Sequence, residues 1–350
     1  MKKFHKTLIS TLLGIAALWM LPQPAAAKDK QQPAAPTNLV WPLPPDKPRL
    51  KFLEMITNNF DVEPKKKLSW VDKMVGNADP NIPETFERAT GVAADSKGRV
   101  FVVSAQRQML YIISKEKHEV IRVRGDRGLV FKTPLGVVVD SQDNFYVADA
   151  SLASVMKFDS QAHLQAAIGS DAGLKNPTFL ALDEGRRRLF VVDSHLHQVL
   201  IFNLDTLQLE STVGKRGEKP GQFNYPVGIA VGPDGSFAVT DTGSCSVEVF
   251  TADLKFVRRI GRQGTRAGEF VRPKGIAYDS EGHIWVVDSA FNNVQIFNPD
   301  GKLLMFVGSH GQNAGEFSVP VGIYIDKKNR VYISDNLNAR VQIFQFLGGN

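Results

Sequence analysis

A short pattern of apolar and polar positions recurs along the chain and predicts its secondary structure. Each copy has Pro-x-Gly, three apolar residues and usually Asp, followed by a turn, an apolar run and a further Asp. One copy reads Pro273-Lys274-Gly275-Ile276-Ala277-Tyr278-Asp279 and then Ile284-Trp285-Val286-Val287-Asp288; similar copies begin at Pro134, Pro226 and Pro320. Apolar runs without alternation are typical of strands covered on both faces. The pattern therefore predicts pairs of buried β-strands.

The spacing of the copies predicts the fold. The last position of each copy falls, 44 to 48 residues apart, at Ser104, Asp149, Asp193, Asp241, Asp288 and Asp335. Two copies are degenerate: one runs from Thr90-Gly91 to Ser104, and the other from Pro177 to Asp193, where Leu180 is interpreted as replacing the glycine. A period in the forties with several short strands is typical of propeller blades. The predicted fold class is all-β, a six-bladed β-propeller of four-stranded blades.

The two ends of the repeat region predict how the ring closes. The last copy stops at Val341–Phe344, its third strand, while residues 49–56 near the N-terminus alternate like a strand. We expect residues 49–56 to complete the sixth blade, because this removes a free sheet edge. A short helix is predicted over residues 68–76, with Ser69 and Asp72 as its capping pair and Gly76 at its end.

The N-terminal residues predict export. Three lysines in Met1–Lys6 precede an apolar run, Leu8–Leu21, and then Ala25-Ala26-Ala27. This order is typical of a secretory signal peptide, here residues 1–27 with cleavage after about Ala27. The apolar run is shorter than a typical span of about 20 residues. We expect a periplasmic or secreted protein without stable membrane insertion after cleavage; a retained membrane anchor is the alternative.

A proline-rich segment separates this signal from the propeller. Residues 28–48 are interpreted as a linker, and residues 49–346 as the propeller domain. Proline removes backbone donors and favours extended, solvated chain, so a spacer is the preferred interpretation and a proline-motif ligand the alternative. Trp41, within the linker, is a candidate for docking onto the domain.

Charge and cysteine content narrow the choice of partner. The formal net charge of +6 falls to about +3 once Lys2, Lys3 and Lys6 leave with the signal peptide. This modest charge argues against nucleic acid as the partner, and we expect a monomer. The one cysteine, Cys245, excludes an intramolecular disulfide, and we interpret it as a small buried hydrophobic residue.

Two strings resemble a known repeat family. They are Gly268-Glu269-Phe270 through Ile276 with its counterpart Gly315–Ile323, and Asp335-Asn336-Leu337-Asn338-Ala339-Arg340-Val341-Gln342-Ile343-Phe344. Both resemble the NHL repeat, and the resemblance covers about residues 86–346. It implies the propeller fold. It leaves the activity open, since NHL-type propellers include protein-binding and RNA-binding modules as well as relatives with lyase activity.

The strand order predicts a binding surface. In a four-stranded antiparallel blade with strands a to d, the d–a loops between blades and the b–c loops share one end of the ring. Loops on a rigid scaffold are common recognition sites. We expect this end to bind an acidic or carboxylate-bearing protein or peptide through Arg124, Arg127, Lys215, Arg216, Arg262, Arg266 and Arg340. The alternative is that these are solvated charges offset by Asp126, Glu218, Glu269 and Glu316.

An enzymatic function is the second hypothesis, as a metal-dependent propeller enzyme, either amidating-lyase-like or a hydrolase. His195-Leu196-His197 has a spacing that could ligate zinc, but no third ligand motif accompanies it. The sequence also lacks the Gly-x-Ser-x-Gly, Walker and H-E-x-x-H motifs. The recurring aspartates are interpreted as turn residues rather than metal ligands. No metal or cofactor is therefore predicted.

Overall fold

Six antiparallel sheets make up most of residues 39–66 and 81–348, the part of the chain that this computed structural model describes. Five of the sheets have four strands and the sixth has five. The predicted signal peptide, the linker up to residue 38 and the predicted helix 68–76 lie outside the described residues.

Each of the first three blades consists of four strands that are consecutive in sequence. Blade 1 contains β3 (Ala89–Ala94), β4 (Val100–Ser104), β5 (Met109–Ser114) and β6 (Glu119–Val123). Blade 2 contains β9 (Pro134–Val139), β10 (Phe145–Asp149), β11 (Ser154–Phe158) and β12 (Leu164–Ile168). Blade 3 contains β13 (Pro177–Asp183), β14 (Arg188–Asp193), β15 (Gln198–Asn203) and β16 (Leu209–Val213). A two-stranded hairpin, β7 (Gly125–Asp126) and β8 (Leu129–Val130), lies between blades 1 and 2.

Blades 4 and 5 repeat this arrangement, and blade 6 combines both ends of the chain. Blade 4 contains β17 (Pro226–Val231), β18 (Phe237–Asp241), β19 (Ser246–Phe250) and β20 (Phe256–Ile260). Blade 5 contains β21 (Pro273–Tyr278), β22 (Ile284–Asp288), β23 (Asn293–Phe297) and β24 (Leu303–Val307). Blade 6 contains β25 (Pro320–Ile325), β26 (Arg330–Asp335) and β27 (Arg340–Phe346), with β2 (Leu50–Ile56) and β1 (Val40–Trp41) added at its outer edge.

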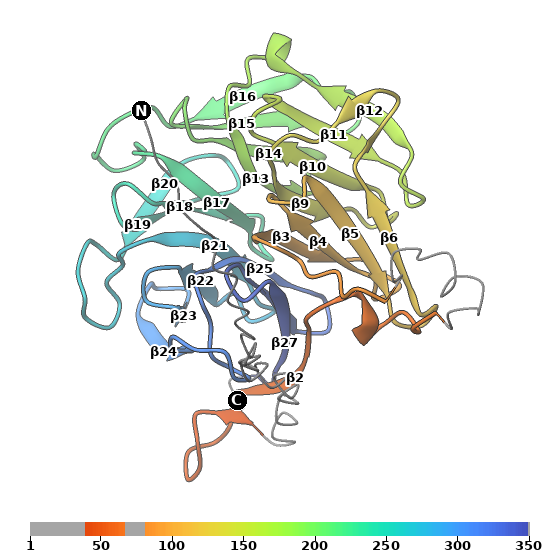
Figure 1. Ribbon diagram of the computed structural model, residues 1–350. Helices are drawn as coiled ribbons and strands as arrows, with labels where there is room; N and C mark the ends of the chain where they lie inside the picture. Colours follow the sequence, from red (N-terminus) through yellow and green to blue (C-terminus); the bar gives the residue numbers. More distant parts are fainter. Residues whose placement is uncertain (1–38, 67–80, 349–350) are drawn as a thin grey trace, which may run out of the picture. The chain divides into compact units, whose positions relative to one another are not determined.

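The first strand of each repeat lies at the inner end of its blade, and these six strands form a closed ring (Figure 1). In order, β3 contacts β9, β9 contacts β13, and the series continues through β17, β21 and β25 back to β3. The predicted six-bladed β-propeller is therefore confirmed.

The closure predicted for blade 6 is also confirmed. β2 pairs antiparallel with β27, placing Leu50 opposite Phe346 and Ile56 opposite Val341. The Trp41 ring on β1 meets the Phe344 ring edge-on, with their centroids 5.7 Å apart. β1 lies within the predicted linker, so the last part of that segment is a strand that covers the blade edge.

Close approach of neighbouring inner strands explains the glycine of the repeat. A Cβ atom on Gly228 would lie 2.2 Å from the carbonyl oxygen of Lys274 in the next blade, and one on Gly322 would lie 2.1 Å from that of Thr90. In blade 3 the register corrects our sequence interpretation: Leu180 pairs with Val191, which leaves Phe179 at the glycine position. The same bulge follows the proline in blades 4, 5 and 6, so the Pro-x-Gly spacing counted from Pro177 also leads to Phe179.

The hydrophobic core is divided among the six interfaces between neighbouring blades. One cluster joins blades 3 and 4 and includes Phe190 and Phe237, whose ring centroids are 5.0 Å apart. Phe237 also stacks on Phe250 within blade 4. The second strand of each blade is almost wholly buried, as its unbroken apolar run predicted.

Helical structure within the described residues is limited to two short 3-10 turns, η1 (Asn59–Asp61) and η2 (Ser170–Ala172). Asn58 caps η1 by accepting a hydrogen bond from the backbone N–H of Phe60. Across these same residues, no helix combines the length and apolarity that crossing a bilayer requires.

Candidate functional site

Three d–a loops at one end of the ring share one backbone structure. They run from Gly214 to Phe223, from Gly261 to Phe270 and from Gly308 to Phe317. In each loop the phenylalanine is fully buried, and its N–H donates to the carbonyl of the loop's second residue, at 2.9, 2.9 and 2.8 Å respectively. Because both ends of each loop are anchored in this way, the residues between them are held in defined positions.

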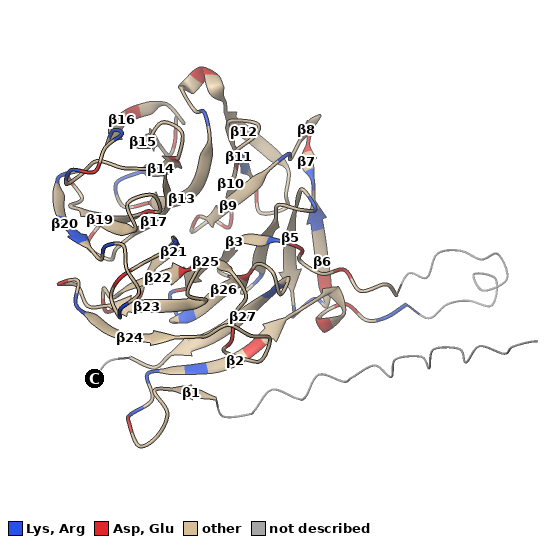
Figure 2. Cartoon of the chain, turned by 60° about the vertical axis from the view of Figure 1, so that its left-hand side comes forward, with Lys and Arg blue, Asp and Glu red and all other residues tan. Residues whose placement is uncertain are grey.

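Four of the predicted cations lie exposed on the first two of these loops: Lys215, Arg216, Arg262 and Arg266. Lysine and arginine residues cluster in the loops around β16, β17 and β20 (Figure 2). Arg262 is 75% exposed and pairs with Glu269 at 3.0 Å. The Glu269 pKa is lowered, first by the backbone N–H of Arg266 and then by Arg262. The third loop has Ser309 and Asn313 where the second has Arg262 and Arg266, so positive charge is concentrated on one sector of the ring.

Arg124 and Arg127 lie in the connection between blades 1 and 2, next to and within the β7–β8 hairpin. Both are exposed, and the Arg127 Nε atom lies 3.9 Å from Asp126. The backbone N–H of Leu164 donates to Asp126 at 2.9 Å and is the first cause of that carboxyl's lowered pKa. These two cations share the loop-bearing end but come from a different sector of the ring than the four cations above.

Arg340 was expected on the exposed binding surface, but the structure buries it. It is 2% exposed, and its Nε atom donates to Asp335 at 2.8 Å. Its remaining nitrogens donate to the carbonyls of Gln312, Asn313 and Glu316. Arg340 therefore fastens the loop between blades 5 and 6 to the strand below it, and we leave it out of the binding surface.

Three cations that the sequence analysis did not single out lie at the inner ends of these loops. Arg88 and Arg272 immediately precede the inner strands β3 and β21, and both are exposed. Lys274, on β21, is half-buried, and its pKa is lowered, first by burial and then by Arg272. Comparing the six repeat copies position by position would have drawn attention to Lys274, because its counterparts are apolar residues or threonine.

The histidine pair is only partly available as a ligand. His195 is exposed, whereas His197 is buried and its Nδ1 atom accepts a hydrogen bond from the Tyr225 N–H at 3.1 Å. Burial, with smaller effects of Arg216 and His195, lowers the His197 pKa. Within residues 39–66 and 81–348, no group of three or more His, Cys, Asp or Glu side chains is arranged to hold a metal ion.

The recurring aspartates accept backbone hydrogen bonds, as their interpretation as turn residues predicted. Asp149, for example, accepts N–H donors from Lys132 at 2.7 Å and from Leu152 at 3.0 Å. It thereby ties a d–a loop to the b–c loop beside it. Cys245 is buried, and its thiol lies 3.3 Å from the Val271 carbonyl, in keeping with a structural role.

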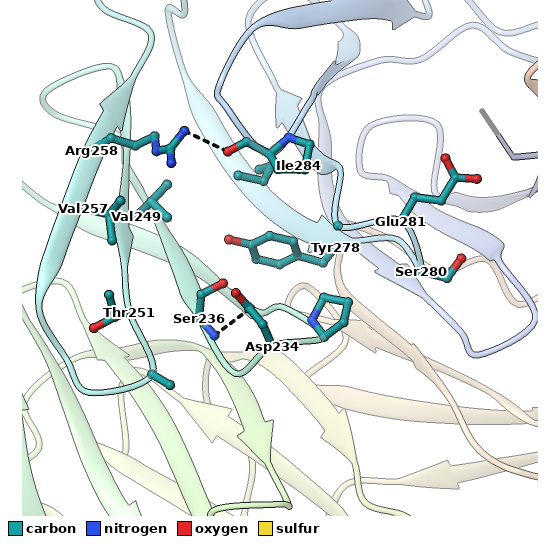
Figure 3. A pocket seen from close by; sticks show the side chains of 14 residues that line it. Asp234, Ser236, Val249, Thr251, Val257, Arg258, Tyr278, Ser280, Glu281 and Ile284 are labelled. Carbon is teal, nitrogen blue, oxygen red and sulfur yellow. Dashed lines mark hydrogen bonds between the residues drawn. The ribbon is translucent and has the colours of Figure 1, made fainter. Parts of the chain in front are cut away.

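A pocket of about 470 Å³ lies between blades 4 and 5, at the end of the ring opposite to these loops. Turn residues of both blades line it, with Tyr278 between Asp234 and Ser236 on one side and Arg258 on the other (Figure 3). Burial raises the Tyr278 pKa to about 12. Arg258 donates to the Pro299 carbonyl at 2.9 Å, whereas the buried Tyr278 hydroxyl has no hydrogen-bond partner among the described residues.

The fold and its repeats define the class of protein. Residues 276–349 match the family model described as a 6-bladed β-propeller, and residues 223–250 match the NHL repeat. The chain is therefore a six-bladed β-propeller that contains an NHL repeat. No curated protein matches it in sequence.

Several solved structures resemble the chain in fold. A virginiamycin B lyase from Staphylococcus aureus is 11% identical, with a TM-score of 0.57 over 76% of this chain and 98% of that one. A gluconolactonase from Xanthomonas campestris is 17% identical, with a TM-score of 0.57 over 75% and 88%. An auxiliary nutrient binding protein from Bacteroides thetaiotaomicron is 13% identical, with a TM-score of 0.59 over 74% and 69%. At these identities the similarity establishes the fold alone.

Proposed function

We propose that this protein is a binding scaffold that recognises an acidic protein or peptide through the loop-bearing end of its propeller. The observation that carries the proposal is the set of exposed cations on anchored loops: Arg124, Arg127, Lys215, Arg216, Arg262 and Arg266. Since the loops are already ordered by their own hydrogen bonds, little conformational entropy is lost when a partner binds.

The acidic residues beside these cations are compatible with the proposal. The exposed Arg262 and Arg127 pair with Glu269 and Asp126, and ion pairs at the protein surface contribute little to stability. Carboxylates of a partner can replace or join such pairs at small cost. The acidic neighbours also limit non-specific attraction, which favours a partner with carboxylates at matching positions.

We further propose that the protein works outside the cytoplasm, as a monomer, after removal of residues 1–27. The lysine-rich start, the short apolar run and the Ala25-Ala26-Ala27 cleavage site support this localisation. A net charge of about +3 after cleavage supports a protein or peptide partner over nucleic acid.

A charge-reversal experiment tests the proposed binding end. The probe is a fluorescein-labelled hexaglutamate peptide, with hexaglutamine as the neutral comparison, and affinity is measured by anisotropy at 50 and 200 mM salt. We expect Arg216→Glu/Arg262→Glu to weaken hexaglutamate binding at least about tenfold and to reduce its salt dependence. The control is Lys327→Glu/Lys328→Glu, which makes the same change in net charge on an exposed turn at the opposite end. Equal affinity of both double variants would refute the proposal.

A metal-dependent enzyme is the alternative function, and the pairing of exposed His195 with His197 at the loop-bearing end is the feature that favours it. Metal analysis of the natively purified protein distinguishes the two functions when it is combined with thermal melting in the presence and absence of chelator. A stoichiometric ion whose removal lowers the Tm supports the enzyme, and His195→Ala would then abolish the effect.

A further inference from the structure

Two sets of equivalent positions surround the centre of the ring at its loop-bearing end. The residues immediately before the six inner strands are Arg88, Thr133, Asn176, Tyr225, Arg272 and Val319. The second residues of the same strands are Thr90, Leu135, Thr178, Val227, Lys274 and Val321. These twelve positions, all within the described residues, carry three cations and no carboxylate. The carboxylates near this end belong to the second strands, where Asp288, for example, accepts the Arg272 backbone N–H at 3.1 Å.

The packing around Lys274 determines where its side chain emerges. One edge of β21 pairs with β22, and the neighbouring inner strands β17 and β25 contact β21 on its two sides. Because these strands cover β21 on its other sides, we infer that the accessible part of the half-buried Lys274 side chain faces the ring axis at the loop-bearing end. The backbone there is fixed, because the Thr240 hydroxyl donates to the Lys274 carbonyl at 2.6 Å.

Within the described part of the chain, the ammonium group of Lys274 has no counter-ion. Among the described residues it makes no ion pair and no hydrogen bond, and Arg272, two residues away, adds a second unpaired positive charge. A partly desolvated cation beside another cation is unfavourable unless an anion neutralises it. The outer cations differ in this respect, since Arg262 and Arg127 each have a carboxylate within 4.0 Å.

We propose that the centre of the loop-bearing end binds one carboxylate on a short aliphatic stem, with the carboxylate on Lys274 and flanked by Arg272. The aliphatic stem follows from the neighbouring positions, which are Leu135, Val227, Val321 and two threonines. A glutamate side chain or a chain-terminal carboxylate of the partner has this chemistry. The inference rests on the proposed function for the identity of the partner, but it concerns a different set of residues.

The test uses glutarate, an aliphatic dicarboxylate, and inorganic phosphate as a second arm. Lysine side chains are labelled by reductive methylation with 13C and observed by NMR at pH 7, and the Lys274 signal is identified by its loss in Lys274→Arg. We expect glutarate to shift the Lys274 signal saturably and phosphate to bind more weakly. We also expect Lys274→Met to weaken glutarate binding, measured by calorimetry, at least tenfold. Lys327→Met, at the opposite end, is the control and leaves the affinity unchanged.

The outcomes separate this inference from the proposed function. A Lys274 signal that does not move, or that moves only in proportion to all other lysines, overturns the inference. So does a Lys274→Met variant that melts like the parent protein and binds glutarate equally well. If Arg216→Glu/Arg262→Glu still abolishes hexaglutamate binding in that case, the proposed function stands without the central site. Phosphate binding tighter than glutarate would overturn the assignment of a carboxylate.

Discussion

The hydroxyl of Thr240 in blade 4 donates a hydrogen bond of 2.6 Å to the backbone carbonyl of Lys274 in blade 5. The Thr240 hydroxyl oxygen also accepts a hydrogen bond from the Gly228 N–H at 2.8 Å, so the Thr240 side chain joins the inner strands of blades 4 and 5. Ser334 makes the equivalent bond to Thr90 between blades 6 and 1, where the ring closes. In blade 3, Thr178 supplies the hydroxyl, bonding to the Val227 carbonyl at 2.8 Å.

This relationship predicts that Thr240→Val destabilises the protein. Valine preserves the shape but leaves the Gly228 N–H and the Lys274 carbonyl without their partner, which costs about 1–3 kcal/mol. Urea unfolding provides the measurement. Thr251→Val, at a partly exposed turn of the same blade, is the control and should change stability by less than about 0.5 kcal/mol. Equal effects of the two substitutions would contradict the role given to Thr240.

Arg340→Met is expected to be among the most destabilising single changes. It removes the ion-pair partner of buried Asp335 and takes one hydrogen-bond donor away from each of three loop carbonyls. Breaking a buried pair from one side costs about 3–5 kcal/mol. Arg262→Met removes an ion pair of an exposed arginine and should destabilise the protein much less. If the two variants unfolded at the same denaturant concentration, Arg340 would not have the stabilising role described here.

Asp241 should make stability fall as pH rises. Its pKa is raised to about 6, chiefly by burial, and one of its carboxylate oxygens has no hydrogen-bond partner. Because the folded-state pKa lies above the usual value of 3.8, the stabilising contribution is complete below about pH 3.8 and is lost as pH rises through about 6. At pH 7, Asp241→Asn should therefore be more stable than the parent protein by about 3 kcal/mol, with the difference vanishing near pH 4. The unfolding free energies of the two proteins are measured from pH 4 to pH 7. A difference that stays constant across this range would contradict the prediction.

Glu63 should have the opposite pH dependence. A hydrogen bond from Arg122, 2.9 Å away, is the main reason that the Glu63 pKa is lowered to about 2. The contribution is therefore present above about pH 4.5 and is lost as pH falls toward 2. Glu63→Gln should lose roughly 1–2 kcal/mol at pH 7 and nothing near pH 2, as measured by chemical unfolding at each pH. As a control, Glu87→Gln removes a more exposed pair with Arg107 and should have a smaller effect.

The repeat pattern predicted the blades because the features it depends on are local. Buried second strands need unbroken apolar runs, and tight turns need particular residues, so both are visible in sequence. The closing strand was predictable because blade 6 lacked a fourth strand. Phe179 was also within reach of the sequence, since it stands two residues after Pro177 as the glycine does in other copies, and the register with β14 agrees.

The candidate site was less accessible to sequence reasoning because burial and pairing depend on distant parts of the chain. Arg340 stands in a loop-adjacent position, like the exposed cations. It is buried because loop residues 312–316 fold over it and the N-terminal strand β2 brings Met55 against it. The lack of a counter-ion for Lys274 likewise depends on residues from other blades. The sequence does show that Lys274 is a lysine where the other five copies have apolar residues or threonine. It does not show the electrostatic environment of Lys274.

Hydrogen–deuterium exchange with and without saturating hexaglutamate tests most directly whether the loop-bearing end is the binding surface. We expect peptides that cover residues 214–223 and 261–270 to exchange more slowly in the complex, while turns at the opposite end, such as residues 326–329, remain unchanged. Slower exchange only at those opposite turns, or no slowing anywhere, would contradict the account.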